Sequence, residues 1–153
     1  MCIMAKRILC IIGLMLLTHT GLYAQFAAFY VSKSEQVSPT VVRLTLTVVA
    51  KDKKLVEYEA VCAAIKAVMF SGCPNTKYSK PLLDVGEATA FEQNPEYFNK
   101  LYNYRVGDFI SSCMPLTKFK GAEGNGTKYE VDVNVLMLRK DLEKNGIRNK
   151  LGI

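Results

Sequence analysis

Histidine is nearly absent from this chain, whose 153 residues include only His19. His19 lies in an N-terminal segment that we expect to be removed, so the working domain would contain no imidazole. Ser-His-Asp and Cys-His nucleophilic pairs need that ring as their general base. Zinc is also disfavoured, because the remaining cysteines show no close pairing and no histidine can complete the ligand shell. We therefore expect a non-catalytic protein with no metal and no cofactor.

The sequence also lacks a hydrophobic run of membrane-spanning length. A spanning helix needs about 20 apolar residues, whereas the run at residues 8–17 is half as long. Lys6 and Arg7 precede this run, and small and polar residues ending at Ala24 follow it. This order predicts a secretory signal peptide at residues 1–24. We expect residues 25–153 to form a single exported domain on the periplasmic or extracellular side of the envelope, with a retained N-terminal anchor as the alternative.

Cysteine is scarce in the expected mature domain, which contains only Cys62, Cys73 and Cys113. Cys62 lies in an apolar, alanine-rich stretch and is interpreted as a small buried side chain. Cys73 and Cys113 each stand at the end of an expected element, so an oxidising compartment would allow a disulfide between them. Spacing alone does not bring two sulfur atoms together, so free thiols are the alternative.

Acidic residues are outnumbered, and the formal net charge of +6 falls to +4 without Lys6 and Arg7. Basic exported domains can meet anionic lipid headgroups, polysaccharides or nucleic acid. The bases are spread along this chain, which favours ordinary solvated surface; peripheral membrane contact and binding to an anionic polymer stay open. An RNA-binding sheet needs paired exposed aromatics on its strands. Tyr129 has no such companion, so we expect no nucleic acid.

The glycine-rich stretch at residues 121–128 has the glycine spacing of a phosphate-binding loop. That loop requires lysine directly after the second glycine and then a hydroxyl, whereas here Thr127 precedes Lys128. The stretch also leads into an expected strand, so no helix N-terminus would face a phosphate. We expect a hairpin turn containing Asn125 and Gly126, and no nucleotide.

Alternating apolar and polar residues, together with turn-forming and helix-ending residues, predict the elements of the first half of the chain. Residues 25–31 could form an edge strand, and residues 32–39 are polar and end in a turn signal. Residues 40–50 alternate apolar and polar side chains, which predicts a strand with one buried face. Residues 55–70 have helical periodicity and many alanines, with Asp52 as a possible cap and Gly72 as the stop.

The second half predicts another helix and a hairpin. Asn94 and Pro95 open a helix that ends near Gly107. Residues 109–119 and 128–138 are two strands of the hairpin, and residues 141–144 form a short terminal helix. These elements predict an α+β fold: a mainly antiparallel sheet of three to four strands with two principal helices packed on one face.

The candidate partner surface combines a long connection with a tyrosine-rich helix. The connection at residues 73–94 contains Pro81 and Gly86 and is longer than packing requires, as is often the case for functional loops. Tyr97 and Tyr104 are seven residues apart, which places them on one face of a regular helix. Tyrosine is enriched in interfaces. The competing interpretation places Tyr102 in the core and leaves the other two half exposed.

A hydrolase that uses two carboxylates is the alternative function. The candidate acids are Asp84, Glu87 and Glu92, and such an enzyme needs two of them facing each other across a cleft. Glu92 and Glu96 have a simpler explanation, since acids near a helix start interact favourably with its dipole. We expect a non-catalytic accessory protein that binds another envelope protein.

The order of elements, with the segments at residues 109–112, 126–135 and 142–146, resembles the small plait domain of flagellar assembly protein T and related outer-membrane lipoproteins. The resemblance covers residues 41–146, apart from the long connection at residues 73–94. It implies a non-catalytic envelope component that works through partners, and it assigns no site residues. The Ala24–Gln25 junction also resembles those of exported proteins of the Bacteroidetes.

Overall fold

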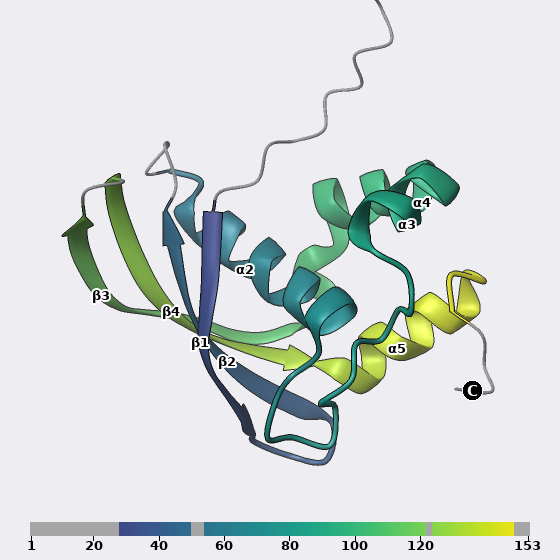
Figure 1. Ribbon diagram of the computed structural model, residues 1–153, viewed down its shortest axis with the longest axis horizontal. Coiled ribbons are helices and arrows are strands. Elements are labelled where there is room, and N and C mark those ends of the chain that lie inside the picture. Colours follow the sequence, from purple (N-terminus) through teal and green to yellow (C-terminus); the bar gives the residue numbers. More distant parts are fainter. Residues whose placement is uncertain (1–27, 50–53, 122–123, 149–153) are drawn as a thin grey trace, which may run out of the picture.

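The computed structural model describes residues 28–49, 54–121 and 124–148, which form a four-stranded antiparallel sheet and its helices (Figure 1). The strands are β1 (Ala28–Gln36), β2 (Val41–Val49), β3 (Ile110–Gly121) and β4 (Gly124–Asn134), in the order β1-β2-β4-β3. The helices are α2 (Val56–Lys66), α3 (Glu87–Gln93), α4 (Pro95–Lys100) and α5 (Val135–Lys144). Short π-helical and 3₁₀ segments continue two of them: η2 (Ala67–Ser71), η3 (Leu101–Arg105) and η4 (Val106–Phe109). The predicted α+β fold is confirmed.

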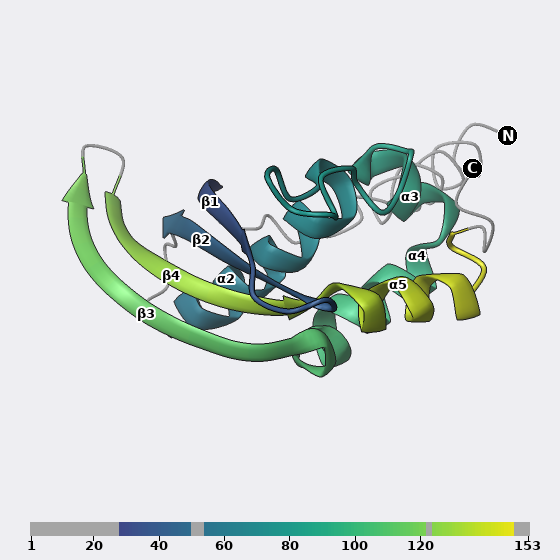
Figure 2. The ribbon, with the colours of Figure 1, turned by 90° about the horizontal axis from the view of Figure 1, so that it is seen from below.

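The sheet is curved, and its helices lie on the concave side or beyond one end (Figure 2). The predicted alternation in β2 is confirmed: the four apolar side chains of one face, Val42, Leu44, Leu46 and Val48, are all fully buried. Val131 and Val133 of β4 stand opposite Leu44 and Val42 and share this face. Burying a side chain of this size contributes about 1.5–3 kcal/mol, so this face stabilises the centre of the sheet.

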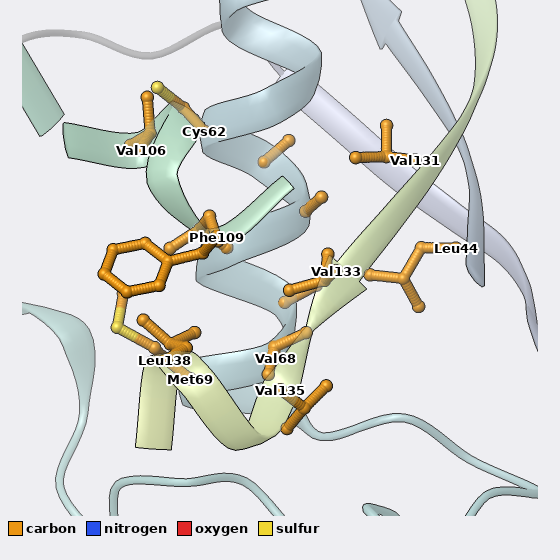
Figure 3. Packing of buried hydrophobic residues seen from close by; sticks show 14 of the residues in the cluster. Leu44, Cys62, Val68, Met69, Val106, Phe109, Val131, Val133, Val135 and Leu138 are labelled. Carbon is orange, nitrogen blue, oxygen red and sulfur yellow. The ribbon is translucent and has the colours of Figure 1, made fainter. Parts of the chain in front are cut away.

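The alanine-rich helix α2 covers that apolar face. Ala60 and Ala64 are fully buried, and their small side chains allow the helix to approach the strands closely. Figure 3 shows Leu44, Val131 and Val133 from the sheet on one side of the core, with Phe109 and Leu138 from the later elements on the other. The predicted cap Asp52 lies outside the described residues.

Gly72 ends the first helical segment, as the sequence predicts. Its φ of 77° and ψ of 179° are accessible mainly to glycine. A Cβ atom at this position would lie 2.4 Å from the carbonyl oxygen of Ser79. The chain therefore needs glycine here for both its backbone angles and its close approach to the next loop.

Strand β1 is longer than the sequence indicates. We expect a turn from residue 32, but the strand continues to Gln36 through an irregularity between Val31 and Lys33. None of the side chains of β1 is fully buried, so polar residues are tolerated there. Ser32 Oγ donates to the carbonyl oxygen of Thr45 at 3.1 Å. Residues 25–27 lie outside the described part of the chain.

The second hairpin and the last helix differ from the predicted boundaries. Pairing of β3 with β4 extends to Gly121 and Gly124, so Asn125 and Gly126 lie within a strand and do not form the turn. Strand β4 ends at Asn134, where we expect it to run to Leu138. The Asn134 side chain accepts a hydrogen bond from the Met137 amide at 3.0 Å and starts α5 there.

Candidate functional site

A depression of about 530 Å³ lies where the end of α3 and the start of α4 meet the end of α5. Its lining residues are Gln93, Asn94, Pro95, Glu96, Tyr97, Lys100, Arg105, Asn145 and Ile147. Pro95 opens α4 at its first position, as the sequence predicts. The proline starts a helix that directs Tyr97 and Lys100 toward the depression.

An ion pair with an added phenol hydrogen bond fixes this region. Arg105 Nη2 lies 2.7 Å from Asp141 Oδ1, and Arg105 Nη1 lies 3.3 Å from Asp141 Oδ2. Tyr97 donates from its hydroxyl to the same Oδ2 atom at 2.9 Å. These contacts join α4 and η3 to α5, and the Asp141 side chain is only 13% exposed. Arg105 Nε also lies 3.4 Å from Asp108 Oδ2. The Arg105 guanidinium packs over the Phe109 ring.

The electrostatics of this cluster favour fixed charge over proton transfer. The hydrogen bonds that Arg105 donates to Asp141 raise the pKa of the Arg105 guanidinium, which stays protonated. Burial, and then the hydrogen bond to Asp141, raise the pKa of the Tyr97 phenol well above its usual range. At neutral pH the Arg105 guanidinium is therefore charged and the Tyr97 phenol neutral, and the same Asp141 carboxylate holds both groups.

The structure separates the two tyrosines of the predicted partner surface. Tyr97 lines the depression and is half-buried, whereas Tyr104 is 83% exposed and does not line it. The chain changes from α-helix to π-helix between them, at Leu101. A π-helical turn holds more residues than an α-helical turn, so a spacing of seven no longer returns to the same face. Tyr102 lies in the core, stacked on Phe91 at 5.5 Å between ring centroids, as the competing interpretation expected.

Pro81 and Gly86 lie outside the depression. Pro81 is half-buried. The next two residues, Leu82 and Leu83, are buried, and their amides donate hydrogen bonds to the end of the first helical segment, which anchors this part of the loop. Gly86 is exposed and precedes the first residue of α3. The stretch at residues 73–94 is thus partly helical and anchored, and its proline and glycine do not line the depression with Tyr97.

The candidate carboxylates of the alternative hydrolase do not gather in the depression either. Asp84 and Glu92 are exposed, and Glu87 forms an ion pair with the buried Lys66. Glu96 is the acid that lines the depression. Among the described residues, no group of three or more histidine, cysteine, aspartate or glutamate side chains could hold a metal ion.

The three cysteines among the described residues are free thiols, and the structure contains no bridge between Cys73 and Cys113, in contrast to the prediction. Cys113 lies near Glu57 in the first turn of α2, whereas Cys73 follows Gly72 beyond the far end of that helical segment. Burial raises the pKa of all three thiols to about 11. They are therefore protonated near neutrality and poor nucleophiles.

Comparison with known proteins adds no family to this geometry: no family model, curated relative or solved structure is similar enough to count as a match. Within the described residues, no helix combines the length and apolar character needed to cross a bilayer.

Proposed function

We propose that this protein is a non-catalytic exported protein that binds another envelope protein, with the depression between α4 and α5 as its contact site. The Arg105–Asp141 ion pair, joined by Tyr97, is the observation that supports the proposal most strongly. It places a cation and a phenol in a fixed geometry at a concave surface. Arginine and tyrosine are the residue types that protein interfaces favour.

The lining of the depression suits a protein segment. Tyr97 and Ile147 supply apolar area, while Glu96 and Lys100 supply opposite charges within the same small surface. The depression is wide open to solvent, whereas small-molecule sites enclose most of their ligand. A partner segment carrying both an acidic and a basic side chain would match this pattern of charge.

The proposed location follows from the charged, apolar and small-residue order of residues 1–24. Cell fractionation tests it, because an exported protein accumulates outside the cytoplasm with residues 1–24 removed. Full-length chain recovered from the cytosol would contradict the location, and it would leave the depression without an envelope partner.

A pull-down from envelope extract tests the contact site with a matched pair of charge reversals. Lys100→Glu changes the depression, whereas Lys80→Glu changes an exposed lysine next to Pro81. We expect the protein and its Lys80→Glu variant to capture the same partner and the Lys100→Glu variant to lose it. Loss with Lys80→Glu alone would assign the contact to the loop that carries Pro81. Capture by both variants would contradict the depression as the site.

A further inference from the structure

One end of the sheet carries exposed apolar and basic side chains together. This tip surface consists of the exposed residues Tyr30 on β1 and Leu116, Lys118, Phe119 and Lys120 on β3, together with the half-buried Lys128 on β4. Tyr30 is 69% exposed, Leu116 47% and Phe119 41%. The β3–β4 hairpin extends beyond the helices here (Figure 2). The tip surface therefore lies far from the depression, which is at the helical end of the molecule.

The strand register brings these residues to the same end. Phe119 stands opposite Gly126, Gly126 opposite Val49, and Val49 opposite Ala28, so one row crosses the whole sheet. Two residues further along, another row contains Tyr30 and Lys128 on the same face. Phe119, Tyr30 and Lys128 therefore share one face of the sheet. Lys118 and Lys120 alternate with Phe119 and stand opposite Thr127 and Asn125 on the other face, so the tip surface includes both faces of the end of the hairpin.

Phe119 is held in place although its ring is partly exposed. The ring lies over Gly126, where a Cβ atom would come within 2.1 Å of the Phe119 Cζ atom. A glycine opposite an aromatic side chain lets the ring cover the backbone of the neighbouring strand. Packing of the ring on Gly126 therefore holds the exposed part of Phe119 in a fixed position.

The lysines of the tip surface have no carboxylate partner at ion-pair distance within the described residues: Lys118, Lys120 and Lys128 take part in none of the seven ion pairs found there. The one acid between residues 116 and 128 is Glu123, which lies outside the described part. The tip surface therefore has an excess of positive charge. An anionic surface would attract it electrostatically.

Apolar side chains between the lysines favour a lipid surface over an anionic polymer. A polymer such as a polysaccharide would gain from the charges but would leave Leu116 and Phe119 in water. At a bilayer, lysines contact anionic headgroups while aliphatic and aromatic side chains enter the interface, and tyrosine is enriched at that depth.

We propose that the tip surface binds an anionic membrane surface peripherally and end-on, with Leu116 and Phe119 at headgroup depth and the three lysines, from both faces of the hairpin, on the anionic headgroups. This inference does not depend on the depression, which is at the other end of the sheet. It would orient the depression away from the bilayer, toward a partner.

The absence of tryptophan from the chain allows a direct test. Phe119→Trp creates a single reporter in the tip surface, and Tyr104→Trp creates a matched exposed reporter near the start of β3, roughly 30 Å of strand away. The protein is expressed from its complete coding sequence, purified from the compartment where it accumulates, and mixed with vesicles. One set contains phosphatidylcholine alone, and the other contains about one third phosphatidylglycerol. Every variant retains the same N-terminal processing, so the neutral vesicles measure any contribution from the N-terminal segment to vesicle binding.

We expect the Phe119→Trp emission to shift to the blue with anionic vesicles only, and the Tyr104→Trp emission to stay unchanged. Exchange of the three lysines for glutamine should weaken vesicle binding on the order of 100-fold, because each lysine near an anionic surface contributes about a fivefold gain. Raising the salt from about 0.05 M to about 0.5 M should release the protein.

Three results would overturn the proposal. The first is no emission shift with anionic vesicles at low salt. The second is salt-sensitive binding to heparin without binding to vesicles, which would assign the lysines to an anionic polymer. The third is a concentration-dependent dimer in sedimentation that buries the Phe119→Trp reporter, which would assign the surface to a second copy of this chain.

Discussion

Arg105 and Asp141 form a two-point ion pair that joins η3 to α5, with nitrogen–oxygen distances of 2.7 Å and 3.3 Å. The two residues come from elements separated by the whole β3–β4 hairpin. Because Tyr97 donates to the same carboxylate, one aspartate fixes both sides of the depression. The shape of the proposed contact site therefore depends on a single acidic side chain.

Asp141→Ala should lower the free energy of unfolding by about 2 kcal/mol, because it leaves a mostly shielded guanidinium and a phenol without their acceptor. Urea denaturation measures the change. Asp108→Asn is the matched control: its carboxylate is 52% exposed and also contacts Arg105, so its loss should cost less than about 0.5 kcal/mol. Equal losses of unfolding free energy for the two substitutions would show that the burial of Asp141 does not increase its contribution to stability.

Gly72→Ala should destabilise the fold by about 3 kcal/mol or more. The substitution adds backbone strain at a positive φ and places a Cβ atom against the backbone of Ser79. Gly107→Ala is the control, since nothing lies within 4 Å of its added Cβ and its φ is not positive. Thermal unfolding should separate the two variants clearly. A Gly72→Ala protein as stable as the Gly107→Ala protein would contradict the described end of the first helical segment.

Asn134→Ala should cost about 1 kcal/mol, because the first turn of α5 loses the side-chain acceptor for the Met137 amide. Asn134→Asp should retain most of the stability, since aspartate caps a helix start equally well. The measurement is the urea midpoint of each variant. If alanine and aspartate gave the same midpoint, α5 would not depend on this cap.

The free thiols predict a stability that falls at alkaline pH. Burial raises the pKa of Cys62, Cys73 and Cys113 to about 11, from an ordinary value of 9.0. Above pH 9 the unfolded thiols lose protons that the folded thiols keep, so each thiol lowers the free energy of unfolding by about 1.4 kcal/mol per pH unit until pH 11. Replacing Cys73 with alanine should make this decline less steep.

Non-reducing mass spectrometry checks the same thiols directly. We expect three alkylatable cysteines after unfolding and little alkylation of the native protein at pH 8. A mass two hydrogen atoms lower that disappears on reduction would contradict free thiols. Reduction followed by peptide mapping would then show which two cysteines are joined.

The sequence pattern predicts the parts of this fold that depend on residues close together in the chain. Alternation in β2, the alanines of α2 and the proline that opens α4 each act within one element, and all three are confirmed. The run after Asn134 is ambiguous, because alternating apolar residues fit a strand while Val135, Leu138 and Leu142 fit a helix. The buried face of α5 and the Asn134 cap decide for the helix.

The candidate site could not be derived from the sequence in the same way. Arg105 and Asp141 are 36 residues apart, and no periodicity or motif links them before the chain is folded. The π-helical segment at Leu101–Arg105 also has no plain signature, so the spacing of Tyr97 and Tyr104 was misleading. Tertiary contacts fix both features.

Photo-cross-linking in living cells tests most directly whether the depression binds a partner. A photoreactive residue replaces Lys100 inside the depression or Lys80 on the surface outside it. We predict a cross-link from position 100 to one envelope protein, absent from position 80 and lost when Asp141→Ala loosens the site. Cross-links of equal yield from both positions, or none from position 100, would contradict the account.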